Sequence, residues 1–515
     1  MSFLPSFFSR GRRPARRQVG RAGRSAATGM LVVALFLPTS APRTHAAAAA
    51  LTDYPLFNFN SMRSGINPFE RILTPATVGR LRRLWTVQLD GVADESLIEL
   101  TGVGAGKNHN LLYTTTRRGV TYALDAATGA TVWKFDPHDQ GLPDYRITTA
   151  TPAADPTKAW IYSASPDGHI HKLSASTGAE APGWPLLVTL HPQDEKIASA
   201  LNLVGSTLLV TTSGYIGDAG NYDGHVVAID TKSRQIGVFN TLCDNIRRLI
   251  IEIGGGTPDC AHVQSGIWAR DGTLVDTMSG SPTRGNVFVA TGNGAYDGVN
   301  NWGDSVLRLA LSGTGLALKD AYTPTNFADL DSQDLDLGST TPILVPRQAG
   351  PHPWLAVQGG KDNYLRVLDR TNLSGRGRLG HTGGELSQLA IPQGGQMPTA
   401  GIAWTDSSGG TWIFYTTDKG VGALRLTVTG SRPSLHLVWV HYDTYSSPLL
   451  AGGVLYAAES GALRAFNPIT GTQLWSSGLS TAGGNIQGVH WESPLVVNGG
   501  VYMPDESGTI SAYGL

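Results

Sequence analysis

Short stretches of alternating apolar and polar residues dominate the chain, and they recur as one repeated unit. Alternation with a period of two is typical of β-strands whose faces pack in a core. Each unit holds an apolar strand that ends near a tyrosine, a few polar residues with a glycine, and a second strand that ends in a Leu-Asp-like pair. Eight such units lie at residues 111–133, 161–178, 208–230, 287–309, 355–372, 413–426, 454–475 and 501–515.

A four-stranded unit of this size cannot bury its own faces, so the units must pack against one another. Around a ring, that arrangement is a β-propeller. The ending D-x-x-T-G-x-x-x-W supports a ring, because its Asp and Gly close a tight turn and its tryptophan begins a further strand. Trp133 and Trp475 occupy this tryptophan position, and we expect both to pack between blades.

The last unit lacks this further strand, since the sequence stops at Leu515, directly after the apolar stretch ISAYGL. Near the other end, residues 81–90 (LRRLWTVQLD) form an orphan strand with Trp85 in the matching position. We therefore predict an all-β fold, an eight-bladed β-propeller over residues 81–515. The N-terminal strand at residues 84–89 is expected to complete the last blade and close the ring.

The composition agrees with this fold, because 64 Gly, 29 Pro and 15% charged residues are typical of a turn-dense folded chain. The first 47 residues contain eight Arg and no acidic residue, followed by a short apolar run at 29–37 and an Ala-rich stretch. This order predicts an export signal at 1–47, a leader segment at 48–80, and a secreted or periplasmic protein. The apolar run has about half of the roughly 20 residues that a spanning helix needs, so we predict no membrane span in the mature chain.

Without the first 47 residues, 31 basic and 40 acidic side chains remain, which gives a net charge of about −9. A nucleic-acid-binding protein would be basic, so we expect no nucleic-acid partner. Cys243 and Cys260 are the only cysteines, and a pair in an exported protein most simply forms one disulfide. We expect this bond in a loop between the third and fourth units, where it would contribute about 3 kcal/mol.

One crossing between strands differs from the others, at residues 290–309 (ATGNGAYDGVNNWGDSVLRL). Most units cross with a short glycine turn, but this one inserts polar and aromatic residues between two apolar runs. Its glycines let the backbone approach a ligand closely. We expect the crossing to lie at the axial mouth of the propeller, beside a cavity of cofactor size.

The repeat as a whole resembles the quinoprotein propeller superfamily, whose enzymes are alcohol dehydrogenases that depend on pyrroloquinoline quinone (PQQ). The repeat alone is not specific, because non-catalytic scaffold propellers carry it too. Four further stretches occur in the order that the dehydrogenases use. They are QSGIWARDG (264–272), TGNGAYDGVNNWGDSVLRL (291–309), TPTNFADLDSQDLDLGSTTPIL (323–344) and KDNYLRVLDRTN (361–372).

The resemblance implies a role for one residue or pair in each stretch. Trp268 matches the floor on which the quinone ring stacks, and Lys361 matches the basic residue that contacts the quinone oxygens. Asn293 matches a calcium ligand, and Asp334 and Asp336 are both candidates for the catalytic base. A quinone that accepts hydride needs a flat apolar surface, a cation and a carboxylate base, so this set of residue types is chemically coherent.

The chain also departs from the family pattern at the metal. No Glu occurs at 214–230, where the family has a calcium ligand; Asp218 and Asp223 are the nearest acids, and we take Asp218, with Asn293 and Asp336, as the candidate metal ligands. Calcium prefers six to eight oxygen ligands, so the loss of a carboxylate weakens the expected site.

A second departure concerns the ring face opposite the tryptophan. The family covers that face with two adjacent cysteines, and here the stretch RITTATP (146–152) runs through the region instead.

Two functions of different classes remain after these observations. One is an exported oxidoreductase that uses PQQ and calcium and acts on alcohols or sugars. The other is a non-catalytic propeller that binds a protein, a glycan or a polymer. The resemblance thus implies PQQ and calcium as cofactors and a small molecule or glycan as ligand, and the completeness of the calcium site distinguishes the two functions.

Overall fold

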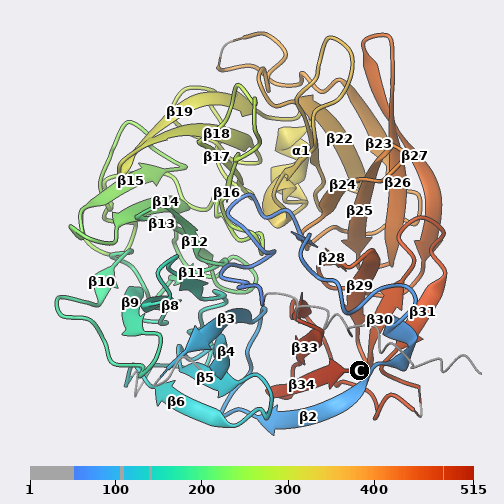
Figure 1. The fold of residues 1–515 in the computed structure, drawn as a ribbon. Helices are drawn as coiled ribbons and strands as arrows, with labels where there is room; N and C mark the ends of the chain where they lie inside the picture. The colour runs from blue at the N-terminus through green and yellow to red at the C-terminus, as the bar shows by residue number, and fades with distance from the viewer. Residues whose placement is uncertain (1–50, 105–108, 139–141, 378, 480) are drawn as a thin grey trace, which may run out of the picture. The chain divides into compact units, whose positions relative to one another are not determined.

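The computed structural model describes residues 51–104, 109–138, 142–377, 379–479 and 481–515. Leu51–Leu515 forms one compact unit in which eight sheets surround a central axis (Figure 1). The prediction of an eight-bladed β-propeller is therefore confirmed. The predicted export signal lies outside the described residues, and none of the helices within them is long and apolar enough to cross a membrane.

Blades one to four follow the order of the chain, and neighbouring strands in each sheet are antiparallel. Blade one contains β3 (Ile98–Val103), β4 (His109–Thr115), β5 (Thr121–Asp125) and β6 (Thr131–Phe135). Blade two contains β7 (Ala153–Ala154), β8 (Trp160–Ala164), β9 (His169–Ser174) and β10 (Leu186–Leu187). Blade three contains β11 (Glu195–Ile197), β12 (Asn202–Val204), β13 (Thr207–Gly214), β14 (His225–Asp230) and β15 (Ile236–Asn240). Blade four contains β16 (Leu274–Val275), β17 (Asn286–Ala290), β18 (Val306–Ser312) and β19 (Gly315–Tyr322).

Blades five to eight continue around the ring, after the short helices α1 (Phe327–Ser332) and η3 (Leu337–Ser339). Blade five contains β20 (Ile343–Leu344), β21 (Leu355–Gln358), β22 (Tyr364–Asp369) and β23 (Ser387–Ala390). Blade six contains β24 (Ile402–Thr405), β25 (Thr411–Thr417), β26 (Gly420–Thr429) and β27 (Arg432–His441). Blade seven contains β28 (Leu449–Ala451), β29 (Val454–Glu459), β30 (Ala462–Phe466) and β31 (Gln473–Ser476). Blade eight contains β32 (Leu495–Val497), β33 (Gly500–Pro504) and β34 (Thr509–Gly514).

The N-terminal strand closes the ring, as the sequence predicts. β2 (Arg82–Gln88) pairs antiparallel with β34 and becomes the outermost strand of blade eight. Trp85 lies opposite Ala512 in this pairing. The first and last parts of the propeller are thereby held in one sheet, which Figure 1 shows as blue β2 beside red β34.

The tryptophan of the repeat packs on a glycine of the next blade. The Trp85 ring of blade eight covers Gly129 of blade one so closely that a Cβ there would lie 2.6 Å from the ring. Trp133 of blade one covers Gly178 of blade two with the same 2.6 Å separation. The Trp85 Nε1 also donates a hydrogen bond of 3.2 Å to the carbonyl of Ala126. The T-G-x-x-x-W motif therefore joins neighbouring blades, since only glycine leaves room for the ring.

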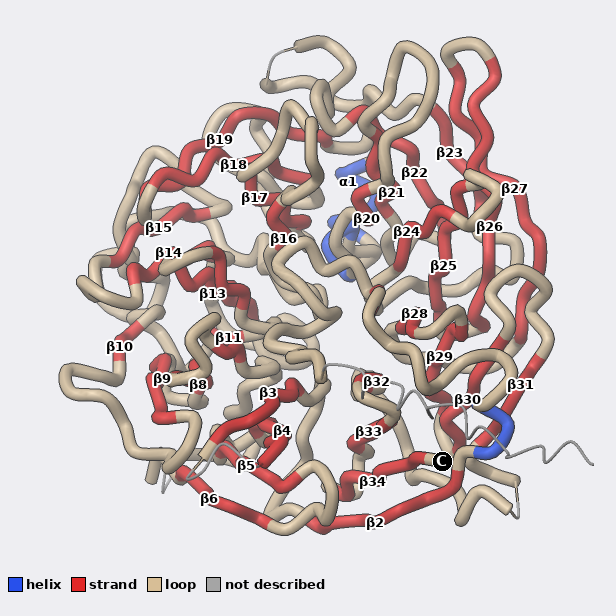
Figure 2. Tube along the Cα trace, in the orientation of Figure 1, coloured by secondary structure: helices blue, strands red, loops and turns tan. Residues whose placement is uncertain are grey.

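The segment that precedes β2 lies against the innermost strands of several blades, and Figures 1 and 2 show it running through the middle of the ring. Tyr54 exchanges two backbone hydrogen bonds with Glu99 of blade one, of 2.8 and 2.9 Å. Farther along, β1 (Ile66–Asn67) pairs in parallel with β28 of blade seven. The helix η1 (Val78–Arg80) then leads into β2.

Arg63 fixes this segment on the axis. Its side chain is buried and donates hydrogen bonds to the carbonyls of Phe57, Ala200 and Leu201, at 2.9 to 3.0 Å. Its Nε donates to the carbonyl of Asp271, at 3.1 Å. Because blade three contributes two of these acceptors and the turn before β16 of blade four contributes another, one guanidinium connects the leader to two blades.

The predicted disulfide is confirmed, because Cys243 and Cys260 are bonded. The bond lies in the segment between β15 and β16, which is the junction of blades three and four. It closes a surface loop of the propeller and lies outside the strands.

Replacing Trp85 by alanine tests the ring closure. Large-to-small substitution of a buried Trp costs 3–5 kcal/mol, and since this ring is half-buried we expect a loss of about 2 kcal/mol in the free energy of unfolding. Leu84→Ala is the matched control, because Leu84 is its neighbour in β2 and is 52% exposed. Urea unfolding followed by circular dichroism measures both variants, and equal losses would contradict the closure by Trp85.

Candidate functional site

The four residues that match the quinoprotein pattern lie at one end of blades four and five. Trp268 precedes β16 and Asn293 follows β17; Asp336 precedes β20 and Lys361 follows β21. In an antiparallel pair, the start of one strand and the end of the next lie at the same edge of the sheet. The order of the strands alone therefore brings these side chains to the mouth of the ring.

Lys361 is the centre of the cluster. Its Nζ lies 2.8 Å from Asp334 Oδ1 and 2.5 Å from Asp336 Oδ2. The same ammonium lies 5.3 Å from the centre of the Trp268 ring, which is the range of a cation–π contact. A positive charge is thus held beside a flat aromatic surface and two carboxylates.

Asn293 completes the cluster with three polar groups. Its backbone N–H donates to Asp336 Oδ1 at 2.8 Å, and its Nδ2 donates to Asp334 Oδ1 at 3.1 Å. Its Oδ1 is buried and has no hydrogen-bond partner, and the same holds for Asp304 Oδ2 nearby. Buried oxygens without a donor are costly, and a hard cation would satisfy them.

The unusual crossing at 290–309 is explained in part by this packing. A Cβ at Gly292 would lie 2.2 Å from Asp336 Oδ1, and a Cβ at Gly294, with φ of 152°, would lie 2.7 Å from the backbone N of Ser265. Glycine is therefore required for the close approach. Asp297 has a different role, because its Oδ1 accepts backbone hydrogen bonds from residues 299–301 and so shapes the turn.

Burial separates the two candidate bases. The Asp336 side chain is 7% exposed, whereas that of Asp334 is 66% exposed. Burial raises the pKa of Asp336, and the ammonium of Lys361 offsets part of the rise. Burial alone would lower the pKa of Lys361, but the two carboxylates raise it. Asp336 is thus a stronger base than an exposed Asp, beside a lysine that stays charged.

Asp218 lies near this cluster without joining it. It accepts a hydrogen bond of 2.6 Å from the hydroxyl of Tyr222. Its negative charge also raises the pKa of Asp336, although burial and Lys361 have larger effects on that pKa. Within the described part of the chain, no hydrogen bond or ion pair connects it with Asn293 or Asp336. Asp223, the other nearby acid, interacts instead with His225 and Glu252. The role of Asp218 as a metal ligand stays a prediction.

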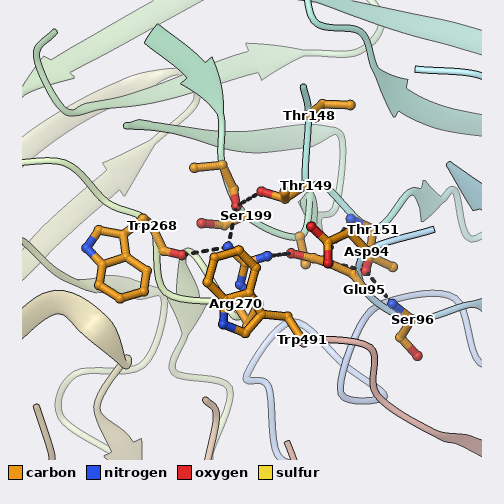
Figure 3. A network of polar contacts seen from close by, with 12 residues as sticks. Asp94, Glu95, Ser96, Thr148, Thr149, Thr151, Ser199, Trp268, Arg270 and Trp491 are labelled. Carbon is orange, nitrogen blue, oxygen red and sulfur yellow. Dashed lines mark hydrogen bonds and ion pairs between the residues drawn. The ribbon is translucent and has the colours of Figure 1, made fainter. Parts of the chain in front are cut away.

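Sequence reasoning missed a second set of residues at the mouth, which Figure 3 shows around Arg270. The buried guanidinium lies 3.2 Å from Glu95 Oε1 and donates to the carbonyls of Trp268 and Ala198, at 3.1 and 3.2 Å. Its Cζ lies 4.0 Å from the centre of the Trp491 ring. Trp491 in turn lies 6.4 Å from Trp268, with the two rings inclined by 47°. A second aromatic side chain thus lies close to Trp268.

Lys196 adds a buried positive charge to this region. It is 5% exposed, its Nζ lies 5.9 Å from the centre of the Trp491 ring, and no carboxylate of the described residues lies within 4.0 Å of it. Burial, followed by the charge of Arg270, lowers its pKa to about 8. Arg117, by contrast, is already paired with Asp94 at 2.9 Å. Lys196 is therefore a buried cation that an anionic ligand would satisfy.

Several features of a quinone site are present, and one is absent. The Trp268 ring, the Lys361 ammonium and the buried Asp336 carboxylate lie together, as the resemblance predicts. The only disulfide, Cys243–Cys260, lies in the loop between blades three and four, so adjacent cysteines do not cover the second face.

Comparison with known proteins agrees with these features. Residues 66–189 match the sequence profile of the family "PQQ: Glucose/ethanol/alcohol dehydrogenase, beta-propeller domain". A quinohemoprotein alcohol dehydrogenase of Comamonas testosteroni is 24% identical over 379 residues, which cover 69% of this chain and 49% of the relative. The chain is thus similar to the quinoprotein alcohol dehydrogenases, and it carries a PQQ-type β-propeller segment at residues 66–189. It matches about half the length of that curated relative.

Solved structures share the architecture of this quinoprotein-like propeller. A quinohemoprotein alcohol dehydrogenase of Pseudomonas putida HK5 has a TM-score of 0.64 and 15% identity, covering 90% of this chain and 80% of that one. A europium-containing methanol dehydrogenase has a TM-score of 0.62 and 15% identity, covering 90% of this chain and 98% of that one. At this identity the likeness establishes the fold alone.

The coupling of Lys361 to Asp336 makes a prediction about pH. In Lys361→Met the buried Asp336 loses its cation, so its pKa rises further in the folded state. A carboxyl with a raised folded pKa lowers stability as pH rises. We expect the variant to unfold like the wild type near pH 4 and to be about 3 kcal/mol less stable at pH 7, as for a broken buried ion pair. Denaturant titrations at a series of pH values measure the difference.

The control is Lys419→Met, because Lys419 is 61% exposed and pairs with its neighbour Asp418 at 3.4 Å. Its effect should be small and nearly independent of pH. A constant stability loss across the pH range in Lys361→Met would contradict the coupling to Asp336.

Proposed function

We propose that the protein binds PQQ together with calcium at the mouth of the ring and oxidises an alcohol or a sugar hydroxyl. One observation carries this proposal: Lys361, Asp336 and Asn293 converge on Trp268 from two different blades. Structural acids and lysines occur on any propeller, but their convergence on an exposed part of an aromatic ring is the arrangement that a quinone needs.

Binding of the cofactor would use the aromatic and cationic groups together. PQQ is flat and carries three carboxyl groups, so its ring suits the surface of Trp268 and its carboxylates suit buried cations. Arg270 and Lys196 are two such cations and lie against the Trp491 ring, and Lys196 lacks an anionic partner among the described residues. Charge-assisted hydrogen bonds to these groups would orient the ring on the tryptophan.

Calcium would be held by oxygen atoms of Asn293 and Asp336, with Asp218 as a third ligand. The unpartnered Oδ1 of Asn293 supports this assignment, because it is a buried acceptor without a donor. The cation would also reduce the repulsion between Asp218 and Asp336. With fewer protein carboxylates than the family pattern, we expect the calcium affinity to be modest.

In the proposed reaction, bound PQQ supplies the acceptor for the hydride of the alcohol. Asp336 accepts the hydroxyl proton at a carboxylate oxygen, and its burial makes it a better base than an exposed aspartate. Lys361 keeps Asp336 ionised before the proton transfer. Its ammonium would also donate hydrogen bonds to the quinone oxygens, which become negative when the hydride is accepted. The hydride and the proton together are the two hydrogens that the alcohol loses.

We also propose that the protein works outside the cytoplasm, in a secreted or periplasmic compartment. The disulfide supports this location, because such bonds persist in oxidising compartments. Electrons would leave the reduced cofactor to an acceptor of that compartment, so an artificial dye is the appropriate acceptor in an assay.

Reconstitution tests the proposed function. The purified protein, loaded with PQQ and calcium, should reduce a dye in the presence of primary alcohols or aldoses. Asp336→Asn should retain PQQ but lose at least about a hundredfold in kcat, the scale of a general base. Trp268→Ala should lose retention of PQQ itself. Asp329→Asn is the matched control, because Asp329 is an exposed acid of α1 and should not affect either readout.

Two outcomes would contradict the proposal. If the folded wild type retains no PQQ after gel filtration with calcium, the alternative of a non-catalytic propeller that binds a protein, glycan or polymer takes its place. If PQQ is retained but Asp336→Asn is as active as the wild type, Asp336 is not the base.

A further inference from the structure

A second polar cluster lies at the edge of blade three and shares no hydrogen bond or ion pair with Lys361, Asp336 or Asn293 among the described residues. Glu195, His225 and Glu252 each offer a ligand atom, and these atoms lie within 4.8 Å of one another. His225 Nε2 lies 3.3 Å from Glu195 Oε2 and 3.4 Å from Glu252 Oε1. The three side chains are at most 1% exposed, so the cluster is inside the protein.

The fold places two of these residues on one face of a sheet. Glu195 of β11 pairs with Gly214 of β13, and Thr211 of β13 pairs with Val226 of β14. His225 therefore lies beside Thr212, two positions from Gly214 along β13. Residues two apart on a strand share a face, and so do their cross-strand partners. Glu195 and His225 consequently project from the same side of blade three.

The third residue comes from outside the sheet. Glu252 belongs to the loop that follows β15 and lies between the two cysteines of the Cys243–Cys260 disulfide. His191 contacts it from the other side, with Nδ1 3.0 Å from Glu252 Oε2. The cluster therefore joins the disulfide loop to blade three.

The acids of this cluster are not satisfied by the protein. Both carboxylate oxygens of Glu195, of Glu252 and of Asp223 are buried without a hydrogen-bond partner. Asp223 is close enough to His225 and Glu252 to interact with both. No Lys or Arg of the described residues forms an ion pair with these three acids. Three buried carboxyl groups thus share two histidines as their only cationic partners.

We propose that Glu195, His225 and Glu252 bind a divalent transition-metal ion, of the class of Zn²⁺, that fastens the disulfide loop to blade three. The donor set carries the choice of ion, because an imidazole with carboxylates suits Zn²⁺, whereas Ca²⁺ and Mg²⁺ prefer oxygen alone. Asp223 is positioned as a further oxygen donor, and His191 positions Glu252. A dication would place positive charge beside buried carboxyl groups that no Lys or Arg of the described residues pairs with.

A second group of potential ligands provides a contrast. Asp94, His490 and Glu506 also lie within 4.8 Å of one another. Arg117 already pairs with Asp94 at 2.9 Å and with Glu506 at 2.7 Å, and the His490 side chain is 46% exposed. The guanidinium of Arg117 thus already balances the acids of that group, so the group is a suitable control.

Metal binding to the intact protein tests this inference. After chelator treatment, addition of Zn²⁺ should restore one tightly bound ion per chain, measured by mass spectrometry of the metal content after gel filtration. The melting temperature should rise by roughly 3 °C at a hundredfold excess over Kd, and chelator should reverse the rise. Zn²⁺ should also slow proteolysis of loop 241–263. Glu252→Gln should lose all three effects, and Glu506→Gln should keep them.

Three results would overturn the proposal. One is a wild-type protein that neither retains Zn²⁺ nor gains stability from it. The second is binding that persists unchanged in Glu252→Gln. The third is binding that Asp336→Asn removes but Glu252→Gln does not, which would assign the ion to the mouth of the ring. Because chelator and Zn²⁺ act reversibly on the wild type, the test holds even if a variant folds poorly.

Discussion

The antiparallel pairing of β2 with β34 is the interaction on which the rest of the structure depends. A blade buries its faces only against its neighbours, so the first and last blades would each expose a face in an open array. Because β2 joins the last sheet and closes the ring, neither of these blades exposes a face. A tryptophan that packs on a glycine of the next blade also joins neighbouring blades. Trp85 packs on Gly129 at the closure, and Trp133 packs on Gly178 between blades one and two.

Ring closure also explains how residues distant in sequence form one mouth. Every blade delivers the start of its innermost strand and the end of its second strand to the same end of the ring. Blades four and five contribute Trp268, Asn293, Asp336 and Lys361 there, while Glu95 arrives from the start of blade one. The segment that precedes β2 runs through the middle of the ring (Figure 1), where Arg63 donates hydrogen bonds to two carbonyls of blade three.

The sequence predicted the fold and the local part of the site for physical reasons. Period-two alternation and the T-G-x-x-x-W motif are local signals, and so was the orphan strand around Trp85. The sequence also singled out Trp268, Asn293, Lys361 and the pair Asp334 and Asp336, because they stand in four matching stretches; the structure places them close together, and their roles stay predictions. Trp491 and Lys196 were not singled out, since only the closed ring brings Trp491 of blade eight to Trp268 and Lys196 of blade three to Trp491. Arg270 stands two residues after Trp268, but its burial against Trp491 and Glu95 has no signal in the sequence.

Other features could be predicted only from the burial of side chains, and no local sequence pattern contains that information. The sequence left Asp334 and Asp336 as equal candidates, and exposure separates them. The path of the leader through the axis was also missed, because residues 51–80 contain no repeat. Glu252 comes from an irregular loop, so its meeting with His225 had no sequence signal.

The central claim is that the mouth over Trp268 receives PQQ, and a crystal structure of the protein grown with PQQ and calcium tests it most directly. We predict density for a flat ring stacked on Trp268, with a quinone oxygen within hydrogen-bond distance of Lys361 Nζ and a carboxylate beside Lys196 or Arg270. A structure at saturating PQQ in which the Trp268 face is empty, or in which PQQ lies elsewhere, would contradict the claim.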